Sequence, residues 1–414
     1  MRVLKKQPGK HPESAAELLR LSESVERVTS IRLIATTAFG LEAVVSRELE
    51  ALGYAERTVS DGRVEFSGDA AAVARANLWL RSADRVLVKL AEFDAVDFGE
   101  LFDQVVELPW CEWLTEESSF PVRARCVRSQ LHSEPDTQAI TKKAIVEALK
   151  RKWPRDWFDE TGAEIPVDVT IRRDKVTIAL DTTGRGLHRR GYRILTGGAP
   201  LRETLAAALL QLSYWEPGRV LADPCCGTGT ILIEAAWMAA NRAPGLGRGF
   251  LAEEWRRLAG PESEGAWKNA REEAADLVVQ PPDVPLLGGD NNPKALELAR
   301  RNAEAAKAGT VIEFQQVAVS DFGPHHKYGC VVTNPPYGER MGERTEAEAV
   351  YGDLGRLARR LETWSVYAMT AHKGFEAIFE EASGRSGQVR RRKLYNGPIA
   401  CTYYQYAGPR PPWN

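Results

Sequence analysis

Hydrophobic and polar positions first fall into a regular order at Ile31, after a polar stretch of mixed charge. Residues 1–30 contain no long apolar run and are expected to form a flexible or partly helical tail. The following stretch alternates between strand-like and helix-like spacing, which predicts a small α+β unit over residues 31–96. Its predicted strands are 31–36, 63–68 and 85–93, and its predicted helices are 39–52 and 69–82.

A second unit is predicted over residues 97–195. Its apolar pattern indicates a strand at 120–129, a helix at 135–153 and an antiparallel hairpin that turns at Arg173-Asp174. The unit ends in a Gly-rich basic segment, TGRGLHRRGYR, at 183–193.

Beyond Pro200 the pattern becomes that of an α/β domain, assigned to residues 196–414. Alternating strands and helices predict a mostly parallel sheet with right-handed crossovers, and the final strands predict an antiparallel edge. Residues 243–285 break the rhythm and are interpreted as an insertion. The predicted helices are 203–215, 230–243, 293–307 and 350–361, and the predicted strands are 219–223, 284–290, 311–321, 328–338, 364–371 and 399–407.

Composition narrows the function classes only slightly. With 414 residues, 43% of them hydrophobic and 27% charged, two or three globular domains are expected. No apolar run approaches the roughly 20 residues of a membrane span, so a cytoplasmic protein without membrane contact is expected. The six cysteines include no CxxC pair and no clustered histidines, which predicts reduced thiols and no metal site. A net charge of -2 does not indicate a polyanionic partner, so any argument for nucleic-acid binding depends on local basic patches.

The strongest local motif stands between a predicted buried strand and a helix. Glycines in such a turn let a ligand approach the backbone closely at the carboxyl end of a sheet. A P-loop is excluded because no GK[ST] follows, and the third glycine of a dinucleotide fingerprint is missing. The opening carboxylate would repel a pyrophosphate but could pair with an ammonium group. The motif comprises Asp223, Pro224, Cys225, Cys226, Gly227, Thr228, Gly229 and Thr230.

Two more carboxylates end neighbouring predicted strands. Asp290 could accept hydrogen bonds from ribose hydroxyls, with Asn291 adding a polar contact. The alternative for Asp290 is to cap the following helix, for which Asn292-Pro293 offers a competing start signal. Asp321 could accept from an adenine amino group or could be an ordinary surface carboxylate.

The third motif, Asn334-Pro335-Pro336-Tyr337, directly follows an apolar strand. Two prolines restrict the backbone, so the Asn334 carboxamide and the Pro335 carbonyl can point at one place. Two acceptors that converge on an NH2 group would turn its lone pair toward an electrophile, and Tyr337 offers a ring for base stacking.

Basic residues interleaved with glycine and with Tyr192 and Tyr395 suit a nucleic-acid backbone, although a solvated charged surface is the competing explanation. The candidates are Arg172, Arg173, Arg185, His188, Arg189, Arg190 and Arg193, the run Arg390-Arg391-Arg392-Lys393, and Lys142 and Lys143 on the 135–153 helix.

With DPCCGTGT followed by NPPYGERMG, the chain resembles the bacterial large-subunit ribosomal RNA guanine-N2 methyltransferases, which are class I (Rossmann-like) methyltransferases. The resemblance extends from Ile31 to Tyr406 and includes APLRETLAAALL and KLYNGPIACTYYQY. It implies a ferredoxin-like domain over 31–96, a THUMP RNA-binding domain over 97–195 and a stand-alone methyltransferase domain without a second fused one. DNA adenine and protein glutamine methyltransferases share NPPY but not the THUMP arrangement.

The resemblance further implies S-adenosylmethionine as cofactor and N2 of a guanine in 23S ribosomal RNA, or its precursor, as target. Thr204 and the DPCCGTGT loop would then contact the methionine part, Asp290 the ribose and Asp321 the adenine, while residues 334–337 would hold the base. Two alternatives remain open, namely a guanine-N2 methyltransferase that acts on transfer RNA and a catalytically idle RNA-binding assembly factor.

Overall fold

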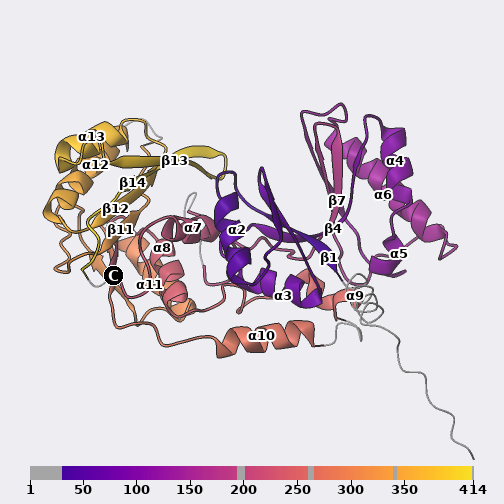
Figure 1. Ribbon diagram of the computed structural model, residues 1–414, viewed down its shortest axis with the longest axis horizontal. Coiled ribbons are helices and arrows are strands. Elements are labelled where there is room, and N and C mark those ends of the chain that lie inside the picture. Colours follow the sequence, from indigo (N-terminus) through magenta and orange to yellow (C-terminus); the bar gives the residue numbers. More distant parts are fainter. Residues whose placement is uncertain (1–29, 194–200, 260–264, 339–342, 413–414) are drawn as a thin grey trace, which may run out of the picture.

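The computed structural model describes residues 30–193, 201–259, 265–338 and 343–412, and the expected tail at 1–30 lies almost entirely outside them. The molecule is elongated, with an N-terminal lobe and a C-terminal lobe side by side (Figure 1). Within the described residues, no helix combines the length and the apolar character needed to cross a membrane.

A single seven-stranded sheet organises the N-terminal lobe. Its strands are β1 (Ile31–Thr36), β2 (Arg57–Ser60), β3 (Arg63–Gly68), β4 (Arg85–Asp94), β5 (Val122–Val127), β6 (Val167–Arg172) and β7 (Lys175–Asp181). The order is β2-β3-β1-β4-β7-β6-β5, and β4 pairs with β7 in antiparallel fashion. The two units predicted from the sequence therefore share one continuous sheet. The hairpin turns at Arg173-Asp174, where both φ angles are positive (53° and 65°), as a two-residue turn between twisted strands favours.

Helices cover this sheet. They are α2 (Glu42–Ala51), α3 (Ala70–Trp79), α4 (Phe98–Val106), α5 (Trp110–Trp113) and α6 (Glu134–Lys150). Of these, α3, α4 and α6 start at side-chain caps. The carboxylates of Asp69 and Asp97 accept the amides of Ala72 and Glu100, which satisfies donors that the first turns of α3 and α4 leave open.

The C-terminal lobe is a doubly wound α/β domain, as the sequence predicted. Its strands are β8 (Leu221–Asp223), β9 (Leu286–Asp290), β10 (Ile312–Gln316), β11 (Cys330–Thr333), β12 (Ser365–Thr370), β13 (Val389–Asn396) and β14 (Ile399–Tyr406). The order β10-β9-β8-β11-β12-β14-β13 is parallel through β12 and antiparallel at β14 and β13. The expected antiparallel edge is thereby confirmed.

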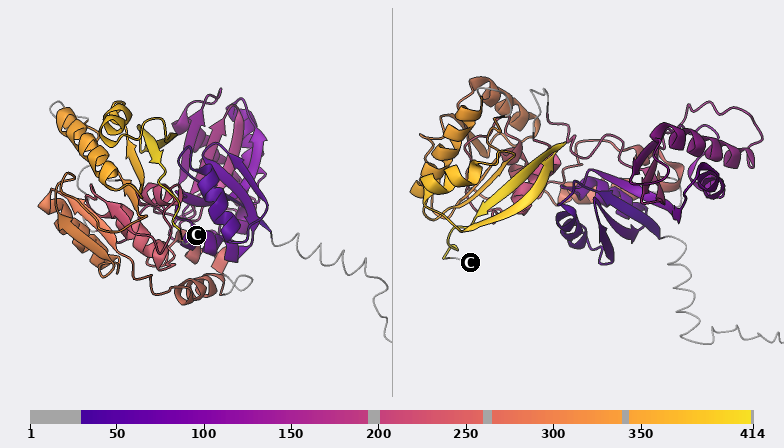
Figure 2. Two further views of the ribbon diagram at one scale, coloured as in Figure 1. Left: turned by 60° about the vertical axis from the view of Figure 1, so that its left-hand side comes forward. Right: turned by 90° about the horizontal axis from the view of Figure 1, so that it is seen from above.

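Helices lie on both faces of this sheet (Figure 2). They are α7 (Glu203–Gln211), α8 (Thr230–Ala239), α11 (Pro293–Ala305), α12 (Glu343–Arg360) and α13 (Phe375–Ser383). Residues of α7, α8 and α11 build one apolar core, and residues of α12 and α13 build another. The sheet is thus buried from both sides, which explains the nearly continuous apolar runs of its central strands.

Several elements escaped the sequence analysis, each for a local reason. Strand β2 is almost entirely exposed, α5 is one turn long, and β13 contains the basic run Arg390 to Lys393, whose charge hides an edge strand. Helices α4 and α13 were also missed. Strands β10 and β11 are shorter than the predicted 311–321 and 328–338, because the chain leaves the sheet where the candidate site residues begin.

The insertion at 243–285 contributes to the core of the other lobe. It forms η1 (Leu251–Glu254), α9 (Arg256–Ala259) and α10 (Ala266–Asp276), and α10 runs along α3 (Figure 1). The buried side chains of Trp255, Leu258 and Trp267 join the apolar core of the N-terminal lobe, and the Trp255 indole N–H donates to the Glu164 carbonyl at 2.9 Å. A segment from the second half of the chain therefore closes the first lobe.

The first prediction concerns this closure. Trp255 is fully buried, so Trp255→Ala should leave a cavity and an unpaired Glu164 carbonyl, and should lower the free energy of unfolding by about 3–5 kcal/mol. Urea denaturation followed by circular dichroism measures the loss. The matched control is Trp157→Ala, because Trp157 is 76% exposed and its removal should change stability by less than about 0.5 kcal/mol. Equal unfolding midpoints for the two variants would show that the inserted segment does not support the N-terminal lobe.

Candidate functional site

The first candidate motif lies where the strand order of the C-terminal sheet reverses. Strand β8 ends at Asp223, and its neighbours β9 and β11 lie on opposite sides of it. Residues 224–229 connect β8 to α8 at the carboxyl end of the sheet. In open α/β sheets the crevice at such a switch point is where ligands bind.

The two glycines of this loop have different physical roles. Gly227 has a φ of 52°, and a Cβ built on it would meet nothing within 4 Å, so it leaves open space beside the backbone. Gly229 has a φ of 81°, but a Cβ there would lie 3.1 Å from the Phe314 ring and 3.3 Å from the Ala299 Cβ. Gly229 is therefore required for packing as well as for its left-handed backbone, whereas Gly227 provides room for a ligand.

Asp223 is buried and connects two strand ends. Its Oδ1 accepts from the Thr333 hydroxyl at 2.6 Å and from the Cys225 amide at 3.2 Å. Burial raises the pKa of the Asp223 carboxyl to about 7, because the charged form is poorly solvated there. Burial also raises the pKa of the Cys225 and Cys226 thiols, so neither is a reactive thiolate at neutral pH.

Asp290 supports the glycine-rich loop and does not cap the next helix. Its Oδ2 accepts from the Gly227 amide at 2.9 Å, and its Oδ1 accepts from the Asn292 amide at 2.9 Å. The side chain of Asn292 caps α11 by accepting from Lys294 and Ala295, so the competing start signal at Asn292-Pro293 is the one used. Each Asp290 oxygen keeps acceptor capacity for a further hydroxyl donor.

The other residues that the sequence assigned to this site differ in their exposure. Asn291 is exposed, and Asp321 is exposed in the turn after β10. The buried Phe322 beside Asp321 packs so closely on Gly289 that a Cβ there would come within 2.6 Å of its ring. Thr204 is buried, and its hydroxyl donates to Asp84 of the N-terminal lobe at 3.5 Å. This contact argues against the assignment of Thr204 to the cofactor, because its hydroxyl faces the other lobe.

The Asn334–Tyr337 segment begins where β11 ends, one residue after the Thr333 that binds Asp223. The Tyr337 hydroxyl donates to the Asn334 Oδ1 at 2.7 Å. The buried Tyr351 of α12 donates to the Pro336 carbonyl at 2.5 Å and lies 3.2 Å from the Thr370 hydroxyl. The loop is thus held from behind by α12 and β12, and the Asn334 acceptor is engaged by Tyr337.

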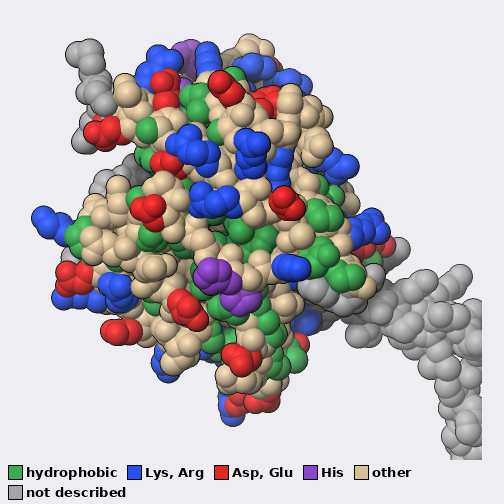
Figure 3. Space-filling view, turned by 90° about the vertical axis from the view of Figure 1, so that its left-hand side faces the viewer, with side chains coloured by type: hydrophobic (Ala, Val, Ile, Leu, Met, Phe, Trp, Pro, Cys, Tyr) green, Lys and Arg blue, Asp and Glu red, His purple; other side chains and the backbone are tan. Residues whose placement is uncertain are grey.

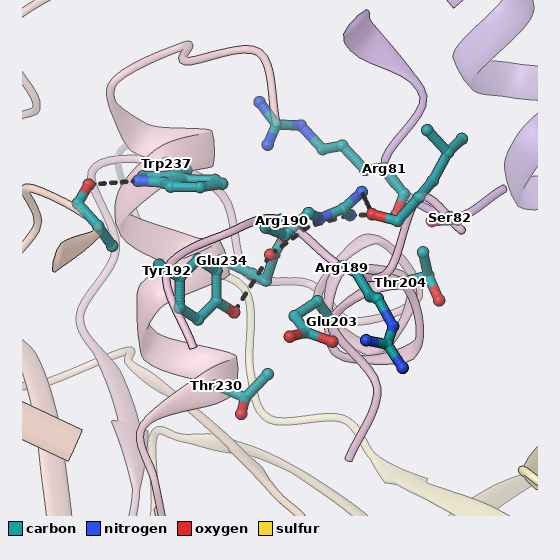
Figure 4. Close-up of polar contacts among 12 residues, drawn as sticks. Arg81, Ser82, Arg189, Arg190, Tyr192, Glu203, Thr204, Thr230, Glu234 and Trp237 are labelled. Atoms are coloured by element: carbon teal, nitrogen blue, oxygen red, sulfur yellow. Dashed lines mark hydrogen bonds and ion pairs between the residues drawn. The ribbon is translucent and has the colours of Figure 1, made fainter. Parts of the chain in front are cut away.

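Arg190 cannot contact a nucleic-acid phosphate, contrary to the sequence-based assignment. It is 3% exposed, and its Nε donates to Glu234, which is fully buried, at 3.3 Å. It also donates to the carbonyls of Leu187 and Arg81, so it joins α8, the N-terminal lobe and the basic segment 183–193, which we call the linker (Figure 4). The sequence run could not show that adjacent arginines point in opposite directions.

Three more assignments need correction. Tyr192 is buried against Trp237 and cannot stack on a base. Arg193 donates to the Thr230 hydroxyl and pairs with Glu203, and its side chain is only 11% exposed. Lys142 donates to Glu160 and lies 3.6 Å from the centre of the Phe120 ring, so its charge is used within the lobe.

The remaining basic candidates divide by environment. Arg185, Arg189 and Lys143 are exposed. His188 is half-buried, and burial together with nearby arginines lowers its pKa to about 4, so it is neutral at pH 7. On β13, Arg391 pairs with Glu376 and Arg392 donates to the Gly40 carbonyl.

Sequence reasoning missed Arg202 and Arg248, which lie beside Arg185 and Arg189 in one cavity. The glycine-flanked arginine of GLGRGF, which resembles the Gly-Arg pattern of residues 183–191, was the available signal for Arg248. On the outer end of the C-terminal lobe, acidic side chains lie among the Lys and Arg residues (Figure 3).

Comparison with known domain families gives three matches. Residues 32–87 match the RlmL ferredoxin-like domain, residues 95–181 the THUMP domain, and residues 190–405 the RMKL-like methyltransferase domain. The last match alone covers more than half of the chain.

Individual relatives match over almost the full length. YpsC of Bacillus subtilis (strain 168), whose name places it among RNA methyltransferases, is 45% identical over 376 residues, which cover 90% of this chain and 95% of YpsC. A Listeria monocytogenes structure described as an N6-adenine-specific DNA methylase is 43% identical with a TM-score of 0.85, covering 93% of this chain and 98% of that one. The structure of SMU.472, a methyltransferase complexed with SAH, is 38% identical with a TM-score of 0.84, covering 92% and 99%.

The second prediction tests the different roles of two adjacent arginines. Arg190→Ala should leave the buried Glu234 without its cationic partner and lower the free energy of unfolding by about 3–5 kcal/mol. Arg189→Ala removes an exposed side chain and should change stability by less than about 0.5 kcal/mol. Chemical denaturation of both variants beside the parent provides the measurement. A similar loss in both, or in neither, would contradict the described orientations.

Proposed function

The chain belongs to the RMKL-like methyltransferase family, and from this membership we propose that it transfers a methyl group to N2 of a guanine in 23S ribosomal RNA. The coarser activity is that of an S-adenosylmethionine-dependent RNA methyltransferase with a THUMP domain. The observation that carries the proposal is the position of the Asn334–Tyr337 segment. It directly follows Thr333, the last residue of β11, whose hydroxyl donates to Asp223.

The glycine-rich loop fits the cofactor. Gly227 leaves open space, Asp223 supplies a buried carboxyl group beside the loop, and Asp290 retains acceptor capacity at the end of β9. We assign Asp223 to the ammonium group and Asp290 to the ribose, with the Cys225–Gly229 backbone forming the floor. Asp321 and Asn291 are assigned to the adenosine end. The bound cofactor supplies an electrophilic methyl group.

The target is proposed to be an exocyclic amine because two acceptors are available for its N–H groups. The Asn334 Oδ1 and the Pro335 carbonyl would each accept a hydrogen bond from one N–H of the amine, which turns the nitrogen lone pair toward the methyl carbon. The Tyr337 hydroxyl engages Asn334 Oδ1 in this structure, so the amine would replace or share that bond. The surplus proton leaves the amine after transfer, and little general-base assistance is needed.

Guanine N2 and adenine N6 both fit such a pair of acceptors. Guanine in 23S RNA is favoured by the ordered resemblance of the whole chain, in which a ferredoxin-like and a THUMP domain precede the methyltransferase domain. The exposed Arg185, Arg189 and Lys143 are proposed to contact RNA phosphates. The target base would leave its stack, and we place the reaction in the cytoplasm on a loop or a precursor RNA.

The third prediction identifies the product. Purified protein with isotope-labelled cofactor should place label in N2-methylguanosine of unmodified 23S RNA, and mass spectrometry of digested RNA identifies the nucleoside. Asn334→Ala should lower the single-turnover rate by roughly a hundredfold, since it removes an acceptor that orients the amine. Tyr337→Phe is the matched control, because it frees the Asn334 acceptor and should keep the rate near the parental value.

Separate reactions with transfer RNA and with DNA distinguish the alternatives. Label in N6-methyladenosine, or labelling of transfer RNA but not of 23S RNA, would overturn the proposed target. Cofactor binding without turnover on any substrate would support an idle assembly factor.

The fourth prediction concerns pH. A cationic ligand prefers ionised Asp223, whose pKa is about 7 in the free protein, so cofactor affinity should fall as pH drops below 7. Between pH 7.0 and 5.5 the dissociation constant should rise about tenfold, as expected when binding must release a proton. Calorimetry across this range measures it. Asp223→Asn should bind more weakly at pH 7 and show a flat profile, whereas an unchanged slope in that variant would assign the pH dependence to another group.

A further inference from the structure

A cavity of about 850 Å³ lies between the basic linker, the start of α7 and the inserted segment. Arg185 and Arg189 come from the linker, Arg202 directly precedes α7, and Arg248 comes from the insertion. The cavity is therefore built by the linker and the nearby start of α7, together with the insertion, which is distant in the sequence. His188 and Glu203 are also among its lining residues.

Arg248 organises the linker side of this cavity. Its guanidinium donates to the carbonyls of Gly186 at 2.8 Å and Arg189 at 3.1 Å, and also to that of Arg185. One cation thus holds the backbone that carries Arg185 and Arg189, while their own side chains stay exposed. The role of the inserted segment was left open by the sequence. Through Arg248 it holds the backbone of the linker in place.

The cavity contains more positive charge than its own carboxylates neutralise. Glu203 is paired with Arg193. In the part of the chain that the structure describes, no carboxylate lies within ion-pair distance of Arg185, Arg189 or Arg202. Burial raises the pKa of the nearby Asp84 carboxyl, and the charge of Arg202 partly opposes that rise. Unpaired guanidinium groups around one concave space attract an anion more strongly than scattered surface arginines do.

His188, which also lines the cavity, lies close to these arginines. Burial, followed by Arg202, Arg189, Arg190 and Arg85, lowers its pKa to about 4. Cations destabilise the protonated imidazole, and an anion placed among them would stabilise it. The pKa of the His188 imidazole is therefore expected to rise when an anion binds in the cavity.

The cavity also borders the cofactor loop. Arg193 in its wall donates to the Thr230 hydroxyl at 2.9 Å, and Thr230 directly follows Gly229. An anion bound here would lie between the THUMP-bearing lobe and the methyltransferase site. Figure 4 shows Arg189 pointing away from the buried Arg190–Glu234 pair, on the side of Glu203 and Thr204.

We propose that this inter-lobe cavity binds an internal phosphodiester of the substrate RNA close to the target nucleotide, with Arg185, Arg189 and Arg202 as the contacting cations. The inference rests on the proposed RNA substrate. Guanidinium groups suit phosphate oxygens because their paired N–H donors match the phosphate geometry. Binding of the RNA backbone by the linker arginines would thereby help to place the target base at the methyltransferase site.

The fifth prediction is a binding test without cofactor, so that it stands apart from methylation. Arg202→Ala should weaken binding of a single-stranded RNA fragment several-fold and reduce the salt slope of log K by about 0.7, the value for one lost phosphate contact. Fluorescence anisotropy at several salt concentrations provides both numbers. Arg32→Ala is the control, because Arg32 is exposed on β1 and does not line the cavity. An unchanged slope in Arg202→Ala would overturn the proposal.

NMR titration of His188 supplies a second readout. Its imidazole pKa should rise on addition of the RNA fragment, equally with and without a 5′-phosphate. A rise only with the terminal phosphate would contradict the assignment to an internal phosphodiester, and no rise would contradict anion binding in the cavity. If the His188 pKa rises but no methylated guanosine forms, the proposal of phosphodiester binding in the cavity is supported and the proposed methylation target is wrong.

Discussion

One buried ion pair holds the linker against the methyltransferase domain and the N-terminal lobe. Arg190 and Glu234 are almost completely shielded from water, and Arg190 also binds a carbonyl of the N-terminal lobe. Two charges are costly to bury, and their mutual attraction offsets that cost only when the remaining donors are satisfied, as they are here. The pair therefore fixes the position of Arg190 between α8 and the N-terminal lobe, and with it the direction of the neighbouring Arg189.

A second constraint couples the two halves of the proposed active site. Asp223 ends β8 and binds Thr333 at the end of β11, so the loop for the cofactor and the loop for the base are held by one short hydrogen bond. Tyr351 supports the Pro336 carbonyl from α12. Because both loops leave adjacent parallel strands, small shifts in one would be transmitted to the other.

The lobes are joined by more than their linker. The inserted segment places Trp255 in the N-terminal core, and its Arg248 donates to carbonyls of the linker. In addition, Arg392 of β13 donates to the Gly40 carbonyl of the N-terminal lobe. The proposed RNA binding and methyl transfer would therefore take place in a frame with several independent attachments. Such a frame suits a reaction in which the base must reach a fixed position relative to the methyl donor.

The sequence by itself determined what local spacing controls, namely the doubly wound sheet, its antiparallel edge and the positions of the DPCCGTGT and NPPY loops at strand ends. It could not determine the partners of charged side chains. Arg189 and Arg190 are the same residue type at adjacent positions, yet Arg189 is exposed and Arg190 pairs with Glu234, 44 positions away. Arg248 and Trp255 belong to a segment that the sequence showed only as an insertion, because the partners of Arg248 lie in the linker and that of Trp255 in the N-terminal lobe. Burial and charge pairing depend on contacts distant in sequence, and only the tertiary structure decided them.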